Sequence, residues 1–372
     1  MIDVLPTFVP LVEGYAEQGD IAQVQAGDMV VESFSSVLPV SQSLLVVGDH
    51  RGRRLFAFST TGSPLWRAGQ SGEGPGDLSG VRSIVPSGSG SLFVHDDRLR
   101  RVSEFSNSGE FMRSIDIRDA DVGLRPAALL GTGLKGELWF RLYGIAPRPG
   151  ESPGIDTVSD YLARLDGGGQ LLVQDSLAAR VYATASLGST ELVLGPQLHV
   201  ALSGDRLISY WTGADQIVVQ RLGSPAQVDS TTTPQPSRTP TVEEVRIARE
   251  LLRPRPFRPP GVSATDRVNI EAMNRARDAI FEAVPAAPTI GYFDGLLADG
   301  NGGAWFRVRN AIVSPTDSTE RWLKLTPEMR WTKGLLLPPH SRLKAVANGQ
   351  VVLERSDDDG VPTLEVWKKR PK

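Results

Sequence analysis

The sequence predicts an all-β fold, the six-bladed β-propeller, and an internal repeat is the main reason. The stretch "LLVVGDHRGRRLFAFSTTGSPL" (44–65) aligns with "LFVHDDRLRRVSEFSNSGEFM" (92–112) at an offset of 47 residues, which places Leu45 on Leu92. Within each copy, apolar and polar residues alternate with a period of two between turns rich in Gly, Asn and Ser. This pattern is typical of antiparallel hairpins. Repeats of this length with about four short strands form the blades of propellers.

Weaker copies of the first repeat strand give the number of blades. They occur at residues 137–140, 206–210, 303–308 and 350–355. The equivalent positions of six units are then Leu45, Leu92, Leu138, Leu207, Ala304 and Val351. The spacing is 46 or 47 residues except between units three and four and between units four and five. Each of those two intervals therefore carries an insertion.

The insertion between units four and five, residues 241–285, is predicted to form two helices. Thr241 and Glu244 have capping-box spacing at the start of the first helix, and Pro285 ends the second. The apolar stripes are Val245, Ala248 and Leu252 in the first helix and Ile270, Met273, Ile280 and Val284 in the second. Helices have no place in a ring of sheets, so this pair must lie on one face, as a packed decoration, a channel lid or a docking element.

A propeller must close its ring, and the last unit offers only three strands. "DMVVESF" (28–34) reads as a strand without a blade of its own. We therefore predict that Met29–Phe34 is the outer strand of the last blade and pairs with the strand around 364–367. The expected organisation is an N-terminal arm (1–27) followed by the propeller (28–372).

The glycine-rich stretch "GQSGEGPGDL" (69–78) raises the question of a phosphate loop. Such a loop needs backbone amides at a helix N-terminus, usually with a following Lys and Ser or Thr. Here the chain continues into another apolar strand without a helix or that lysine. We interpret the stretch as the junction between blades one and two, where glycines permit positive φ angles.

The repeats resemble the NHL-like six-bladed β-propellers of bacteria. The resemblance covers most of residues 28–370, and its residues are Asp49 and Arg54 in "VVGDHRGRRLFAF", together with "GEGPGDL", "DGNGGAWFRV" and "GVPTLEVWKKR". These motifs define blades and not a site, and the turn "HDDRLRRV" lacks the usual Gly or Asn. The resemblance implies a periplasmic or extracellular location, although the N-terminus does not read as a signal peptide.

Composition excludes several classes of function. The net charge is −3, which is too balanced for the electrostatics of nucleic-acid binding. The chain has no cysteine, so disulfides, thiolate catalysis and Cys-ligated metals are excluded. No apolar run approaches the roughly 20 residues of a transmembrane helix.

Residues on the predicted innermost strands are the candidates for a channel site. His199 in "QLHVAL" and Asp294 in "GYFDGLL" are polar residues on such strands, and His340 begins the last blade. The basic residues assigned to these strands are Arg82, Arg125, Arg342 and Lys344. A channel ligand would therefore be anionic. His50 and His95 adjoin turns with Asp49 and Asp96, and we expect them to be solvated turn residues.

Catalytic chemistry finds little support in the sequence. Six-bladed propellers that resemble this chain include calcium-dependent lactonases and phosphotriesterases, whose ion is held by Glu, Asp and Asn side chains of inner strands. Calcium needs about six to eight oxygen ligands, but the predicted inner strands supply one carboxylate and no asparagine. No G-x-S-x-G turn or other nucleophile arrangement is evident. We predict no metal, cofactor or catalytic residue.

Two classes of function are compatible with the sequence. The favoured one is a non-catalytic platform that binds a protein, as a subunit of a larger and membrane-associated assembly. The other is a small-ligand receptor or lactonase-like hydrolase that uses the channel. For the platform, the docking elements would be the apolar N-terminal arm and the insertion, whose proline-rich segment carries Arg253, Arg255 and Arg258.

Overall fold

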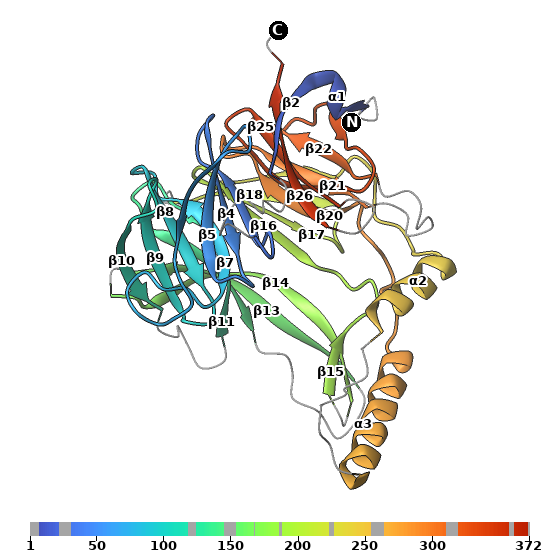
Figure 1. The fold of residues 1–372 in the computed structure, drawn as a ribbon. Helices are drawn as coiled ribbons and strands as arrows, with labels where there is room; N and C mark the ends of the chain where they lie inside the picture. Colours follow the sequence, from blue (N-terminus) through green and yellow to red (C-terminus); the bar gives the residue numbers. More distant parts are fainter. Residues whose placement is uncertain are drawn as a thin grey trace.

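Six mainly antiparallel sheets follow one another around a ring, so the chain is a six-bladed β-propeller (Figure 1). The computed structural model describes residues 7–21, 31–117, 124–144, 154–166, 168–185, 188–222, 227–253, 264–309, 319–356 and 361–370. The six equivalent positions predicted from the repeat all lie on the second strands of their blades. The predicted fold is therefore confirmed.

Blades one to three contain thirteen strands. Blade one consists of β3 (Ser36–Pro39), β4 (Leu44–Asp49), β5 (Arg54–Ser59) and β6 (Pro64–Ala68). Blade two consists of β7 (Val81–Pro86), β8 (Ser91–Asp96), β9 (Arg101–Ser106) and β10 (Phe111–Asp116). Blade three consists of β11 (Leu124–Thr132), β12 (Leu138–Gly144), β13 (Gly154–Leu165), β14 (Leu171–Ala185) and β15 (Gly188–Glu191).

Blades four to six complete the ring. Blade four consists of β16 (Leu198–Ser203), β17 (Arg206–Trp211), β18 (Gln216–Arg221) and β19 (Val228–Thr232). Blade five consists of β20 (Phe293–Ala298), β21 (Ala304–Val308), β22 (Arg321–Leu325), β23 (Gly334–Leu336) and β1 (Phe8–Pro10). Blade six consists of β24 (Ser341–Ala347), β25 (Gln350–Ser356), β26 (Pro362–Lys369) and β2 (Tyr15–Ile21).

The innermost strands β3, β7, β11, β16, β20 and β24 contact one another in this order, and β24 returns to β3. Each strand exposes alternate side chains to the two neighbouring blades, so the core consists of apolar layers between blades. The layer between blades one and two includes Val46, Leu55, Val81 and Phe105, all at most 1% exposed. These layers hold the inner strands at fixed heights around the channel.

The ring is closed by an N-terminal strand, as predicted, but the strand is a different one. β2 pairs antiparallel with β26, with Tyr15 opposite Lys369 and Ile21 opposite Leu364. The predicted strand Met29–Phe34 is wrong: residues 31–34 are not in a strand, and Met29 lies outside the described residues. Val31 and Phe34 are nevertheless buried, because they fill the layer between blades six and one.

The N-terminal segment also contributes to blade five. β1 pairs in parallel with β23, with Phe8 opposite Gly334. The four-residue helix α1 (Leu11–Gly14) follows it and leads into β2. Leu11 is 1% exposed and packs in the layer between blades five and six, whereas its neighbour Val12 is 49% exposed.

The glycine-rich stretch is a junction between blades, as the sequence predicted. It links β6 to β7, and Gly69 and Gly76 have φ angles of 77° and 78°. The Arg101 guanidinium donates hydrogen bonds to the stretch at the carbonyls of Glu73, Gly74 and Asp77, over 3.0, 2.8 and 2.7 Å. The loop thus turns carbonyls toward a cation, the opposite of a phosphate loop, which turns amides toward an anion.

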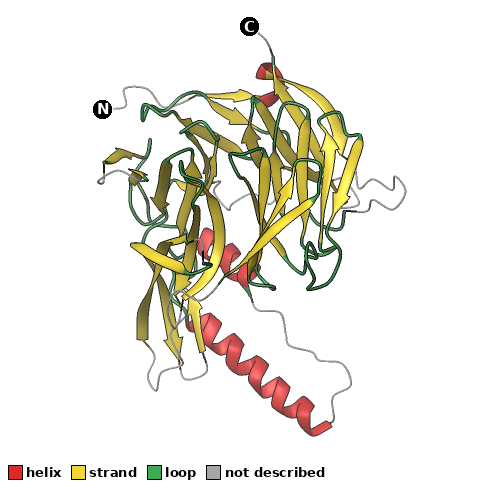
Figure 2. Ribbon diagram, turned by 90° about the vertical axis from the view of Figure 1, so that its left-hand side faces the viewer, coloured by secondary structure: helices red, strands yellow, loops and turns green. Residues whose placement is uncertain are grey.

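The helical insertion, defined as α2 (Val242–Leu252) and α3 (Ala264–Ala283), projects from the ring beside the outer end of β13–β15 (Figures 1 and 2). The predicted capping box is present, since Glu244 N donates to Thr241 Oγ1 and Thr241 N to Glu244 Oε2. Arg249 of α2 donates to the carbonyls of Phe281 and Glu282 at the end of α3 and to the carbonyl of Val284 just after it. This ties the two helices together at one end only.

The predicted apolar stripes are only partly buried. Ala248 is 3% exposed and Val284 2% exposed, and both pack against the segment 192–194 after β15. Met273, by contrast, is 43% exposed. Within the described ranges, no helix combines the length and the apolar character needed to cross a membrane.

Leu11 tests the contribution of the N-terminal segment to stability. We expect Leu11→Ala to lower the free energy of unfolding by about 2–5 kcal/mol, because it opens a cavity between blades five and six. Val12→Ala is the matched control on the same short helix and should cost less than about 0.5 kcal/mol, since Val12 is half exposed. Urea unfolding of both variants measures the difference. Equal costs would contradict the closure described above.

Candidate functional site at the channel mouth

Most of the predicted channel residues occupy equivalent positions on the innermost strands. The second residue of each such strand after blade one is polar, and these residues are Arg82, Arg125, His199, Asp294 and Arg342. They therefore lie on one face of the ring, where the innermost strands begin. We call this face the channel mouth. Lys344 lies two residues further along β24.

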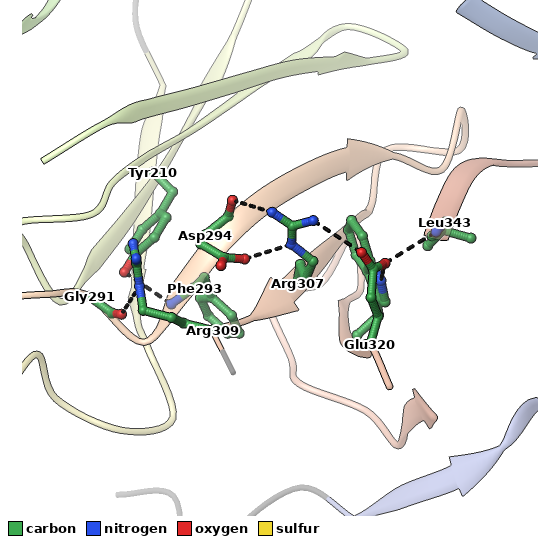
Figure 3. Close-up of polar contacts among 9 residues, drawn as sticks. Tyr210, Gly291, Phe293, Asp294, Arg307, Arg309, Glu320 and Leu343 are labelled. Carbon is green, nitrogen blue, oxygen red and sulfur yellow. Dashed lines mark hydrogen bonds and ion pairs between the residues drawn. The ribbon is translucent and has the colours of Figure 1, made fainter. Parts of the chain in front are cut away.

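A chain of ion pairs connects blade five to blade six at the channel mouth (Figure 3). Asp294 Oδ1 lies 2.6 Å from Arg307 Nε, and Arg307 Nη1 lies 3.1 Å from Glu320 Oε1. The other oxygen of Glu320 accepts hydrogen bonds from Trp322 Nε1 and from the backbone N of Leu343, over 2.8 and 3.2 Å. Asp294 is therefore engaged by an arginine, which is itself held by a second carboxylate.

His199 is the predicted residue with the most unusual environment. Its ring stacks on Tyr210 with a centroid distance of 6.5 Å, and Nε2 is buried with no hydrogen-bond partner among the described residues. Burial lowers the pKa of His199 to about 4, an effect that nearby Asp294 opposes and that nearby arginines reinforce. The imidazole is therefore neutral at pH 7.

Two arginines that the sequence reading missed complete this group. Arg141 Nη2 lies 2.6 Å from Asp160 Oδ2, and its guanidinium covers the ring of Tyr143 at 4.8 Å. Arg309 donates to the carbonyl of Gly291 over 3.2 Å and has no carboxylate partner among the described residues. Both arginines act on the electrostatics of His199, which places positive charge from blades three and five around it.

The repeat contained a signal for this outer layer. Three residues after each equivalent position of the second strands come Gly48, His95, Arg141, Tyr210, Arg307 and Glu354. Four of these six residues contact a channel-mouth group: Tyr210 stacks on His199, Arg307 binds Asp294, Glu354 binds Lys344 and Arg141 binds Asp160. Superposing the six repeats at this position would have identified them.

A hollow of about 350 Å³ lies at the channel mouth between blades five and six. Its lining residues are Glu320, His340, Ser341, Arg342, Glu354 and Ser356. Lys344 does not line it, because Nζ is bound to Glu354 Oε2 at 2.9 Å and to the carbonyl of Phe34 at 2.8 Å. Arg342 is exposed and has no side-chain partner among the described residues.

The remaining predicted residues either contact other parts of the protein or lie away from the channel mouth. Arg82 Nε is 3.4 Å from the carbonyl of Ala127 and so links blades two and three. Arg253 forms a surface ion pair with Glu282 across the helical insertion. Arg255 and Arg258 lie outside the described residues.

The aspartates and the histidine near these turns all have structural environments. The Asp49 and Asp96 side chains accept backbone amide hydrogen bonds from the turns that follow them and from the strand-joining segments before their blades, as expected of structural aspartates. His95 is not a solvated turn residue. It is 1% exposed on β8 with its ring edge-on to Phe140 at 5.3 Å, and burial lowers its pKa to about 4.

The carboxylates of this site are engaged in pairs. Asp160, Asp294, Glu320 and Glu354 each bind an arginine or a lysine. Over the described ranges, no group of three or more His, Asp or Glu side chains is placed to hold a metal ion. The carboxylates can therefore orient the arginine and lysine side chains, which present hydrogen-bond donors to a ligand.

Comparison with known proteins supports the fold. No protein-family model matches the chain, and no curated protein matches it in sequence. A predicted exported protein from Bacteroides fragilis has a similar structure, with 11% identity, a TM-score of 0.54 and 98% of each chain covered. A member of the DUF4221 family from Bacteroides vulgatus is 10% identical, with a TM-score of 0.51 and 96% of each chain covered. The chain thus shares its fold with bacterial six-bladed propellers, and the NHL-like assignment stays a prediction.

The burial of His199 predicts a pH dependence of stability. Its pKa is about 4 in the folded protein and about 6.5 when exposed, so the unfolded chain gains a proton first as the pH falls. The free energy of unfolding should therefore decrease from pH 6.5 to 4. We expect His199→Gln to remove up to about 1.4 kcal/mol per pH unit from this slope. Urea midpoints measured at several pH values provide the test, and an unchanged slope would show that His199 is not buried in its neutral form.

Proposed function

We propose that this propeller is a non-catalytic binding platform whose helical insertion docks a protein partner at the channel-mouth face. The observation that carries this proposal is the exposure of apolar side chains on α3. Among its described side chains, Phe281 alone is buried, while Val268 and Met273 are 63% and 43% exposed. An α-helix of 20 residues is about 30 Å long, so most of α3 extends beyond the packing that holds its end.

An isolated polar helix of this kind has little support from its own fold. Helical stability in proteins comes mainly from packing of an apolar face. The ion pairs on the insertion are exposed: Arg246 binds Glu243 and Glu250, and Arg253 binds Glu282. Exposed pairs contribute about 0–1 kcal/mol each. A partner that covers the apolar residues of α3 would supply the missing packing.

The channel-mouth chemistry supports binding in preference to catalysis. General acid–base catalysis requires a carboxyl or imidazole group with a pKa near the working pH and access to the substrate. Here the described carboxylates of the site are paired, and His199 has its pKa near 4. The same groups can preorganise arginines as donors for a bound ligand.

A photo-crosslinking experiment tests the docking proposal. A photoreactive residue at the exposed position Ala272 on α3 should give one dominant cross-linked protein in cells of the native organism. The double substitution Val268→Glu and Met273→Glu should then weaken binding of that purified partner at least tenfold, because it places charge on the apolar docking surface.

The matched control uses exposed apolar residues far from the insertion in sequence. Leu134 and Leu65 are 79% and 53% exposed, so Leu134→Glu with Leu65→Glu makes the same chemical change. The control should keep wild-type affinity. If no cross-link rises above background, or if both double variants lose the partner equally, α3 is not the docking element.

A second function, a receptor for a small anion, is favoured by one specific observation. Arg309 and Arg342 have no carboxylate partner among the described residues, and they flank the ion-paired groups of the mouth and its 350 Å³ hollow. Neutral His199 and the paired Arg307 add further donors. A lactonase-like hydrolase would need the same hollow together with a metal that these residues are not arranged to hold.

Inorganic phosphate is a suitable probe for the receptor function. We expect calorimetry to show one site that Arg309→Ala with Arg342→Ala weakens at least tenfold, because the positive charge without a carboxylate partner at the mouth is lost. Arg330→Ala with Lys333→Ala removes the same charge from the connection between β22 and β23, at the opposite face, and is the control. Equal affinity in all three proteins would exclude the channel mouth as the anion site.

We further propose that the protein acts outside the cytoplasm. The predicted exported protein from Bacteroides fragilis has the same fold over almost its whole length, and the cysteine-free composition is compatible with an oxidising compartment. Cell fractionation with an antibody against the native protein would locate it.

A further inference from the structure

A second, larger hollow lies on the face of the ring opposite the channel mouth. It has a volume of about 540 Å³ and is bordered by β10 of blade two and by the two hairpin turns 133–137 and 166–170 of blade three. The first turn joins the end of the innermost strand β11 to β12, which places the hollow on the opposite face of the ring, between blades two and three. This volume falls in the range of small-molecule sites.

Apolar residues form part of the hollow. Phe93, Ile115, Leu138 and Leu165 line it, and all four belong to or pack against the apolar layer between blades two and three. Phe93, Leu138 and Leu165 are at most 5% exposed. A ligand that enters would therefore meet an already packed apolar surface.

The two acidic lining residues are used by the fold. Glu137 Oε2 accepts the amide of Lys135 at 2.9 Å, and Asp166 Oδ1 accepts the amides of Gly168 and Gln170 at 2.9 and 2.8 Å. Both carboxylates thus hold the hairpin turns that border the hollow. Neither forms an ion pair with a lining cation among the described residues.

The three basic lining residues retain hydrogen-bond donors. Lys135 and Arg164 have no ion pair and no side-chain hydrogen bond among the described residues. Arg113 Nε lies 2.7 Å from Glu104 Oε2, while the Arg113 side chain is 62% exposed. Glu104 is buried and also accepts a hydrogen bond from the Ser91 hydroxyl at 2.5 Å. It therefore holds Arg113 through Nε and leaves the two terminal nitrogens of the guanidinium available to a ligand.

We infer that this hollow binds a small amphipathic anion, meaning a carboxylate, phosphate or sulfonate carried on a flat apolar body. The apolar surface would receive the body, while Lys135, Arg164 and Arg113 would donate to the anionic group. The blade-two side supplies one cation and the blade-three side supplies two, so the site depends on the packing of these two blades against each other. This inference is independent of the docking role of α3.

Naphthalene-2-sulfonate is the probe for this site, because it combines an aromatic body with a fixed negative charge. Calorimetry on the full chain should show one bound molecule. We expect Lys135→Glu with Arg164→Glu to weaken binding at least tenfold. Neutral 2-naphthol and inorganic sulfate, which each carry half of the probe's chemistry, should each bind at least tenfold more weakly than the probe.

Two further variants keep the test decisive. Arg51 and Arg98 are exposed at turns on the channel-mouth face, so Arg51→Glu with Arg98→Glu makes the same charge change and should keep full affinity. Ile115→Trp fills the hollow without changing its charge and should abolish binding, with thermal unfolding used to confirm that each variant is folded. Unchanged affinity in the Lys135/Arg164 or Ile115 variant, or equal loss in the Arg51/Arg98 control, would overturn the inference.

Discussion

The closure of the ring is the constraint on which the other features depend. Blade six combines β2 from one end of the chain with β24–β26 from the other, so it forms only when the two ends meet. Blade six is then joined to blade one by side-chain donors on carbonyls, from Lys344 to Phe34, Asn348 to Pro39 and Gln350 to Gln42. These contacts hold β24 against β3, so the six innermost strands form a closed series of neighbours. The channel mouth is the face where these strands begin.

Equivalent positions in the repeat explain why polar groups meet at the channel mouth. Two positions recur in the blades: the second residue of the innermost strand, and the residue three places after the equivalent position of the second strand, here called the outer position. In blade one, Gly48 occupies the outer position, where an added Cβ would lie 2.5 Å from Val81 Cγ1. In blades three to six, the outer position carries Arg141, Tyr210, Arg307 and Glu354, and each of these orients a neighbour. Side chains at the outer position of blades three to six therefore contact and orient polar side chains nearby, whereas blade one has no side chain at this position.

The number of blades, the second strands and the helical insertion could be predicted because they depend on apolar periodicity. The closing strand could not: β2, "YAEQGDI", is mostly polar and lies at the outer edge of its sheet, where backbone pairing determines its place. Val31 and Phe34 gave a false strand signal because they are buried without pairing. For a similar reason, only part of the candidate site could be predicted from the sequence. Innermost-strand residues follow from the repeat, whereas the partners of His199 and Asp294 depend on contacts between strands and blades.

The helical insertion and the channel mouth share one short segment of chain. After α3, Ala286 pairs with Val193 and Ile290 with Arg238, and the chain then enters β20, whose second residue is Asp294. Gly291 is the tightest point, since an added Cβ would lie 2.2 Å from Tyr210 Oη, and its carbonyl accepts Arg309. Tyr210 in turn stacks on His199. Residues 286–294 therefore connect the end of α3 to Arg309, Tyr210 and Asp294 through pairing and packed contacts, without crossing the rest of the ring.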